Sequence, residues 1–234
     1  FEDHLGFTWI GTDDGLNRYD GYEFLTFRNS PLDDNSISNN TINSISEDAD
    51  KHLWIGTDQG LNRLDGETGG FVNYTFDLYD ESSLSSNTVW CMTRDSENNL
   101  WVGTANGLNR FDKSQNNFLR FKQEFGDDTS LDNNNINSLY TCSDGQLWVG
   151  TNQGLNCWIP EIHSFKRFPL PESLDRRSVA IQCIQEDAQG RLLVGTDLGL
   201  LEIVDDKLEV CTRYEFTAKS IRALTVDKGS ALWV

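Results

Sequence analysis

The sequence predicts an all-β fold, and three observations lead to this prediction. A Trp-Ile/Val-Gly-Thr block recurs along the 234 residues at intervals of about 45 residues. Each interval holds four short apolar segments with the alternation of half-buried strands. No segment has the i, i+3, i+4 apolar spacing of a helix long enough to connect parallel strands. The chain is therefore expected to be a series of antiparallel sheets.

The recurring block is the expected second strand of each repeat. Its first copy spans residues 9–12 and reads Trp-Ile-Gly-Thr. Later copies begin at Trp54, Trp101, Trp148, Leu193 and Trp233. Only the copy at Leu193 lacks the tryptophan. Chance does not produce such a series, so the chain consists of tandem repeats.

The expected first strand precedes this block and alternates between apolar and polar residues. Its copies are predicted at 42–47, 89–94, 136–141, 181–186 and 221–226. One central position is always small, and it holds Ser44, Cys91, Ser138, Cys183 and Ala223. A small side chain there would let neighbouring repeats pack closely, and the tryptophan of the second strand is expected to fill the space between them.

Turn residues separate the remaining strands. A glycine at a fixed place after the second strand, such as Gly60, supplies the positive φ of a tight hairpin. The third strand is predicted at segments such as 61–65, and the fourth at aromatic segments such as 71–76. A longer polar link follows, as at residues 31–40. Each repeat is therefore expected to be a four-stranded antiparallel meander.

Four strands per repeat of about 40–45 residues are the signature of a β-propeller blade. We expect a β-propeller of four-stranded antiparallel blades, with about five blades present as part of a larger, seven-bladed array. Blades are expected at 37–80, 84–127, 131–171 and 175–216, with partial blades at 1–30 and 217–234. A closed five-bladed ring, in which residues 221–226 pair with residues 8–12, is the alternative. A solenoid is less suitable because its repeats are usually shorter.

The charge of the chain limits its partners. Asp and Glu number 37 against 19 Lys and Arg, so the net charge is −18. Such a surface repels phosphate backbones, which argues against nucleic acid, and it disfavours docking on anionic membranes. No apolar run approaches the roughly 20 residues of a membrane helix. We expect no direct membrane contact by this segment.

No residue pattern indicates catalysis, a metal site or a cofactor. The five cysteines contain no Cys-x-x-Cys pair and no zinc-site spacing, and they are expected to be buried thiols. The three histidines, His4, His52 and His163, fall in or beside turns. Nucleophile-elbow, zinc-protease and phosphate-loop motifs are missing from the sequence.

Charged residues that recur once per repeat are interpreted as structural. The acids Asp48, Asp95 and Asp187 follow the first strand and are expected to accept turn amides. The arginines Arg18, Arg63 and Arg110 are expected to tie one blade to its neighbour through Asp20, Asp65 and Asp112, with binding of anionic sugars as the alternative. The acidic links at 33–34, 80–81 and 127–128 are interpreted as solvated loops, with Ca²⁺ binding as the alternative.

One residue that departs from the repeat is the predicted ligand contact. Trp90 interrupts a column that is otherwise polar, formed by Asn43, Asn137, Gln182 and Arg222. The face of an aromatic ring stacks well on a sugar. Trp90 is therefore the predicted ligand-binding residue.

The pattern of residues 44–65, Ser-Ile-Ser-Glu-Asp followed by Leu-Trp-Ile-Gly-Thr, Gly-Leu and Arg-Leu-Asp, resembles the two-component regulator propeller repeat. The fourth and fifth repeats depart from it at framework positions, for example with Cys157 for Arg and Leu193 for Trp. The resemblance implies an extracytoplasmic, periplasmic sensor part of a bacterial membrane protein. Its output would be a histidine kinase, a diguanylate cyclase or a DNA-binding domain, and its ligand a small molecule such as a glycan.

The expected function is therefore ligand sensing by a non-enzymatic module of a two-component or cyclic-di-GMP signalling protein, with homodimers formed through the parent protein. Two other classes stay open, because a fold alone does not decide function. One is a secreted propeller enzyme, a lyase or a glycosidase. The other is a protein-interaction scaffold.

Overall fold

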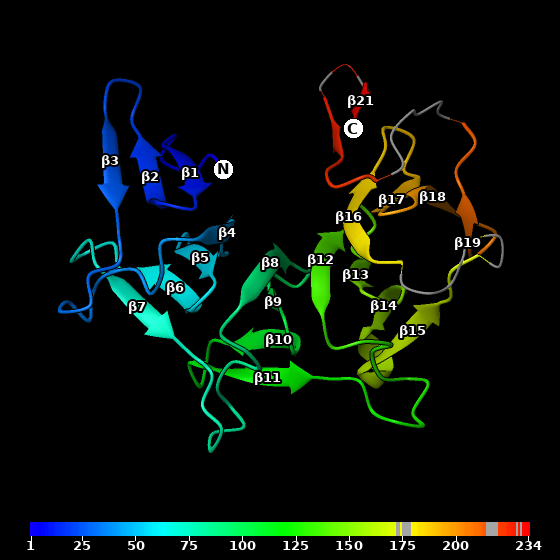
Figure 1. Cartoon of the computed structure of the whole chain (residues 1–234), viewed down its shortest axis with the longest axis horizontal. Coiled ribbons are helices and arrows are strands. Elements are labelled where there is room, and N and C mark those ends of the chain that lie inside the picture. The colour runs from blue at the N-terminus through cyan, green and yellow to red at the C-terminus, as the bar shows by residue number, and fades with distance from the viewer. Residues whose placement is uncertain (172–173, 175–178, 214–219, 228, 230) are drawn as a thin grey trace. The chain divides into compact units, whose positions relative to one another are not determined.

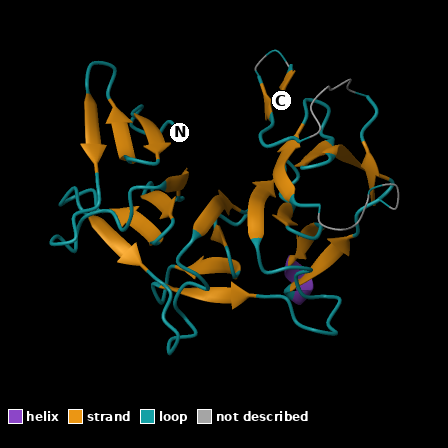
Figure 2. Cartoon of the chain, in the orientation of Figure 1, coloured by secondary structure: helices purple, strands orange, loops and turns teal. Residues whose placement is uncertain are grey.

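The computed structural model confirms the predicted all-β propeller fold of four-stranded antiparallel blades. It describes residues 1–171, 174, 179–213, 220–227, 229 and 231–234. Figures 1 and 2 show strands joined by loops and one short 3-10 helix, Pro160–Ile162. None of the helical structure in these residues is long and apolar enough to cross a membrane. The chain divides into two compact units, Phe1–Arg120 and Phe121–Val234.

The first unit contains three antiparallel sheets, in which each strand pairs with the next along the chain. The three-stranded sheet comprises β1 (Thr8–Thr12), β2 (Gly15–Tyr19) and β3 (Phe24–Phe27). The second sheet comprises β4 (Ile42–Glu47), β5 (Leu53–Thr57), β6 (Gly60–Leu64) and β7 (Phe71–Tyr74). The third comprises β8 (Val89–Arg94), β9 (Leu100–Thr104), β10 (Gly107–Asp112) and β11 (Asn117–Phe121).

The second unit continues the same pattern. One sheet comprises β12 (Ile136–Thr141), β13 (Leu147–Thr151), β14 (Leu155–Ile159) and β15 (Ser164–Phe168). The next comprises β16 (Ile181–Glu186), β17 (Leu192–Thr196), β18 (Gly199–Val204) and β19 (Lys207–Val210). The strands β20 (Thr225–Val226) and β21 (Leu232–Trp233) form a short pair.

One predicted strand is shorter than expected. Within the described residues, the segment 221–226 pairs at Thr225–Val226 with β21, which comprises only Leu232–Trp233, while Ile221 packs against Leu193 and Cys211. The expected blade limits at residues 175, 216 and 217 lie outside the described residues.

Three second-strand tryptophans, Trp9, Trp54 and Trp148, pack between sheets, as predicted. In the first unit, Trp54 of β5 is fully buried against Leu84, Val89 and Leu100, which precede or belong to the next sheet. In the second unit, Trp148 of β13 packs in the same way against residues of the following sheet. Burying a side chain of this size contributes several kcal/mol, so these contacts join adjacent blades into one core.

The glycine that follows the tryptophan permits this close approach. Gly56 lies opposite Ser44 in the β4–β5 ladder. A Cβ atom on Gly56 would lie 2.4 Å from Ser44 Oγ and 2.6 Å from Val89 Cγ1 of the next sheet. The predicted small residue and this glycine therefore act together, because both make room for a β-branched residue of the following blade.

The links between blades are ordered loops that dock on the outer strand of the following blade. An amide at the start of each fourth strand donates to a link carbonyl. The pairs are Phe71 with Asn35, Phe118 with Ser82 and Phe165 with Thr129, at 2.7, 2.8 and 2.7 Å. Each link thus covers part of an edge strand, which protects that edge from pairing with other chains.

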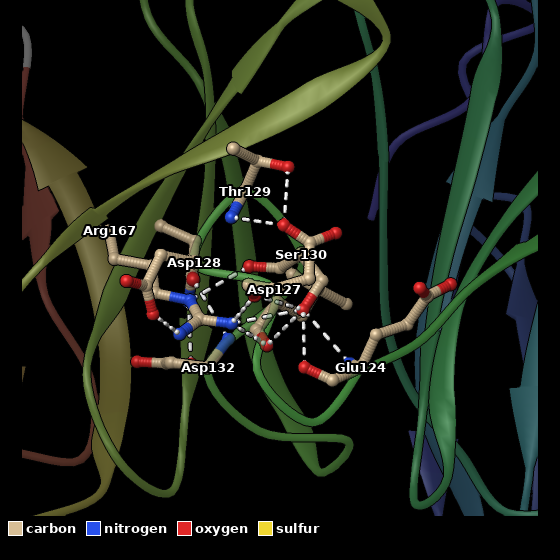
Figure 3. Close-up of polar contacts among 9 residues, drawn as sticks. Glu124, Asp127, Asp128, Thr129, Ser130, Asp132 and Arg167 are labelled. Atoms are coloured by element: carbon tan, nitrogen blue, oxygen red, sulfur yellow. Dashed lines mark hydrogen bonds and ion pairs between the residues drawn. The ribbon is translucent and has the colours of Figure 1, made fainter.

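An arginine on the fourth strand fastens the link in two of these blades. Figure 3 shows Arg167 of β15 pointing into the loop that contains Asp127 and Ser130. Its Nε donates to the Ser130 carbonyl at 2.9 Å, and its Nη2 donates to the Asp127 carbonyl at 2.6 Å. Arg120 of β11 makes the corresponding bonds to the preceding link. The links are therefore held in place by hydrogen bonds, and acids such as Asp33, Asp80 and Asp128 remain exposed to solvent.

The first acid of each link belongs to this loop structure. Asp33, Asp80 and Asp127 accept the backbone amide two residues further on, at 3.0, 2.8 and 2.8 Å. A carboxylate in this arrangement caps its own turn.

Candidate functional site

The predicted ligand contact, Trp90, lies at a β-bulge. It stands between Val89 and Cys91, where the register of β8 against β9 shifts. The same irregularity occurs in β4, β12 and β16, so the polar column of the sequence analysis is a column of bulge residues. A bulge aims a side chain away from the ladder, which explains why these residues stay available at the start of the first strand.

The neighbouring bulge residue in the first unit forms a polar pair. Asn43 Nδ2 donates to Asp58 Oδ1 at 2.9 Å and to the Val89 carbonyl at 3.0 Å. The second bond brings this amide–carboxylate pair to the residue that precedes Trp90. The amide and the carboxylate therefore lie beside the backbone of the bulge that carries Trp90.

The bulge at Trp90 lacks such a partner. Asp58 follows the second strand of its blade, and the equivalent residue in the blade of Trp90 is Ala105. Within the part of the chain that the structure describes, Trp90 Nε1 has no hydrogen-bond partner, and the side chain is 38% exposed. Trp90 therefore offers a ring face for stacking and an N–H donor, a combination suited to a polar ring-shaped ligand.

The recurring acids accept turn amides, as predicted, and they also hold the tryptophans. Asp48 Oδ1 accepts the amides of Asp50 and His52 at 2.9 and 3.0 Å. Asp48 Oδ2 accepts the indole N–H of Trp54 at 2.8 Å. The recurring six-residue separation of this pair is the signal that the sequence analysis missed. Burial alone would raise the pKa of Asp48, but the bonds from Trp54 and His52 outweigh it and lower the pKa.

The same turn contains a group of residues with metal-ligand chemistry. Ligand atoms of Asp48, Asp50 and His52 lie within 4.8 Å of one another. Each is already engaged: Asp48 accepts the bonds just described, His52 Nδ1 lies 3.1 Å from Asp48 Oδ2, and Asp50 forms an ion pair with Lys113. The group is a turn structure and carries no metal assignment.

The interpretation of the recurring arginines is wrong. Arg63 and Arg110 do not tie blades together through their aspartates; their guanidinium carbons lie 5.7 Å from the rings of Trp54 and Trp101 in the same blade. Asp65 instead accepts amides of its own turn. The planar guanidinium favours the tryptophan face. Spacing alone does not distinguish this contact from an ion pair.

The histidines and cysteines do not assemble into a site. His4, at a turn, places Nδ1 2.5 Å from Glu47 Oε1, and His163 is exposed. None of the five cysteines forms a disulfide; Cys157 and Cys211 are buried, and the other three are partly buried. Burial raises the pKa of Cys157 to about 12, so this thiol is neutral at physiological pH.

Comparison with known proteins shows which family the repeats resemble. A family model described as two component regulator propeller matches residues 36–59, 83–106 and 130–153. A curated protein from Formosa agariphila, Histidine kinase P4, is 51% identical over 37 residues. This stretch is 16% of the chain and 3% of that protein.

Two solved structures share the fold across the chain. The extracellular domain of the putative hybrid two component system BT3049 from B. thetaiotaomicron has a TM-score of 0.75 at 24% identity. It is matched over all of this chain, which spans 37% of its length. Virginiamycin B lyase from Staphylococcus aureus has a TM-score of 0.69 at 14% identity, over all of this chain and 75% of that one. At these identities the likeness concerns the fold.

The matched segments coincide with the links and first two strands of three consecutive blades, which are the parts that the structure shows to repeat most closely. The chain is thus a stretch of β-propeller in which three repeats match the two-component regulator propeller repeat.

Proposed function

We propose that this chain is the ligand-binding sensor module of a bacterial two-component signalling protein, that it works on the extracytoplasmic, periplasmic side of the membrane, and that it performs no catalysis itself. The observation that carries the proposal is the agreement of two independent comparisons. The repeats match the two-component regulator propeller model, and the fold matches the extracellular domain of a two-component system. The stretch shared with a histidine kinase supports the same function.

The site at Trp90 supports a glycan as the ligand class. An exposed indole face can stack on the C–H surface of a sugar ring, while the Asn43 and Asp58 side chains accept or donate to its hydroxyls. Binding would favour one of two states of the parent protein, which acts as a homodimer.

The test uses the parent protein in membrane vesicles. Protease added from the periplasmic side is expected to cut this segment, and fractionated glycans are expected to change kinase autophosphorylation. Trp90→Ala should abolish that response while changing the unfolding free energy by less than about 1 kcal/mol, because the side chain is already 38% exposed. A matched exposed aromatic, Tyr22, gives the control Tyr22→Ala. Location of the segment on the cytoplasmic side would overturn the proposal.

A lyase is the second candidate, because the fold also matches virginiamycin B lyase. An enzyme needs an acid–base group near the reacting bond. In the described residues, His4 contacts Glu47 at the end of β4 and His52 contacts Asp48 of the following turn, and neither contacts Trp90. Turnover of a glycan or of virginiamycin B by the purified chain would favour this candidate over the sensor.

A further inference from the structure

An open pocket of about 520 Å³ lies in the first unit, between the end of β3, the following link and the β6–β7 turn. Its volume falls within the range of about 300–1,000 Å³ that small-molecule sites occupy. The rings of Phe27 and Phe71, which lie edge to face with centroids 5.6 Å apart, contribute the apolar part of the lining. The remaining wall is mainly polar and includes Asp33, Asn35 and Asp65.

The equivalent gap one blade further on is bridged. Tyr74 at the end of β7 donates its hydroxyl to Asn116 Oδ1 in the β10–β11 turn at 2.8 Å. Phe27 is the counterpart of Tyr74, because Phe27 pairs with Leu16 as Tyr74 pairs with Leu61. Phe27 has no hydroxyl group to make this bridge.

The turn residue that would complete the bridge is also missing. Gly69 lies four residues after Asp65, as Asn116 lies four residues after Asp112. Both adopt the left-handed backbone conformation, with φ of 73° and 52°. The pocket is therefore open at this one position because the hydroxyl of one residue and the amide of the other are absent. Nothing in the fold of the blade requires either change.

The charge of the pocket is negative. Its one guanidinium, Arg28, is paired with Asp14, with Nη2 2.8 Å from Asp14 Oδ2. Within the described residues, Asp33 and Asp65 form no ion pair. The amides of Glu67 and Thr68 hydrogen-bond Asp65 and hold its pKa below the ordinary value, so this carboxylate is ionised at neutral pH. The nearby Arg63 lies over Trp54 and does not line the pocket.

We propose that this pocket binds a small organic cation, a molecule that carries an amine together with hydroxyl or amide groups. The amine pairs with Asp33 and Asp65, and the carbon skeleton lies against the two phenylalanine rings. An anionic ligand is rejected, because it would meet two carboxylates without a free cation. This site is separate from the one at Trp90.

Binding in this pocket does not depend on the proposed function. Only its role as a second ligand site of a sensor rests on that function. Binding is measured on the 234-residue chain alone, and signalling on the parent protein. If the isolated chain binds the probe but the parent protein does not signal, the sensor function is refuted and the pocket assignment stands. If the parent protein signals but the isolated chain does not bind, the pocket assignment is refuted and the sensor function stands.

The test is a calorimetric titration with three probes of the same ring but different charge: glucosamine, glucose and glucuronate. Glucosamine is expected to bind most tightly and glucuronate not at all. Asp65→Asn should weaken glucosamine binding by about fivefold or more, because it removes a charge-assisted hydrogen bond. Equal binding of all three probes, or of none, would overturn the proposal.

Matched variants separate the pocket from general damage to the fold. The double variant Phe27→Tyr, Gly69→Asn rebuilds the bridge of the next blade and should abolish glucosamine binding without loss of thermal stability. Asparagine tolerates the backbone at residue 69, since Asn116 adopts the same conformation. Tyr74→Phe with Asn116→Gly removes the bridge elsewhere and should leave binding at the original pocket unchanged. Retained binding in the bridged variant contradicts the assignment.

Discussion

The carboxylate of Asp48 accepts the indole N–H of Trp54 at 2.8 Å, across the turn that joins β4 to β5. The pair recurs as Asp3 with Trp9, Asp95 with Trp101 and Asp227 with Trp233, at 2.7, 2.7 and 3.0 Å. In the first three pairs a buried ring is thus oriented by the turn of its own blade, whereas Trp233 is exposed. Four predictions concern this contact and the others that hold the repeat.

The first prediction is a coupling between Asp48 and Trp54. Asp48→Ala should lower the free energy of unfolding by about 1–3 kcal/mol, because a buried donor and two turn amides lose their acceptor. Trp54→Phe removes the N–H, so Asp48→Ala should cost less in that background. A double-mutant cycle by urea denaturation measures the difference. Asp50→Ala, in the same turn, is the control and should change stability little, because its ion pair is exposed. Additive effects would contradict the coupling.

The second prediction concerns acid. The folded pKa of Asp48 lies below its ordinary value of 3.8, so its contribution to stability is full above that pH and is lost as pH falls through the folded pKa. Asp187 and Asp227 behave alike. Denaturation curves between roughly pH 6 and pH 2.5 should therefore show the difference between the native chain and Asp48→Asn shrinking toward the acid end. A difference that stays constant with pH would show that Asp48 does not titrate in this way.

The third prediction separates the stacking of Arg63 from an ion pair. Arg63→Met should lower the free energy of unfolding by about 0.5–1 kcal/mol, because the guanidinium leaves the face of Trp54. The loss should be nearly the same in low salt and in about 1 M NaCl, where exposed ion pairs are screened. Arg63 and Asp65 should show almost no coupling in a double-mutant cycle. Strong coupling that salt removes would restore the ion-pair interpretation.

The fourth prediction concerns the fastening of the link by Arg120. Its guanidinium donates to the carbonyls of Asp80, Ser83 and Leu84, at 2.7, 2.8 and 2.9 Å. Arg120→Ala should lower stability by about 2 kcal/mol and speed amide hydrogen exchange over residues 78–86. Lys113→Ala removes the same charge from an exposed position and serves as the control. Unchanged exchange in the link would contradict the fastening role.

The strand pattern could be predicted because the same residues recur at the same spacing. A tryptophan, a glycine and a turn aspartate repeated in register specify where each strand begins, and packing between blades repeats with them. The last first strand is shorter than predicted, because apolar alternation does not reveal that its partner β21 comprises only Leu232–Trp233. The periodicity of apolar residues indicates a strand, but it does not indicate how many of its residues pair with a neighbouring strand.

The candidate site was less accessible to sequence reasoning. Trp90 was singled out because it breaks the repeat, but the bulge that exposes it is invisible in an alternating pattern. The arginine contacts were misassigned, because a charge near an opposite charge in sequence need not meet it in space. The pocket near Gly69 arises from side chains that are absent, and only a comparison of two gaps in the folded chain reveals it.

The packing of Trp54 against residues of the following blade has an evolutionary consequence. Each repeat carries both halves of the contact: a ring that is offered to the next blade and a surface that receives the ring of the previous one. A duplicated repeat is therefore complementary to its neighbours on both sides. An array can gain whole repeats without further substitutions at the contacts between blades.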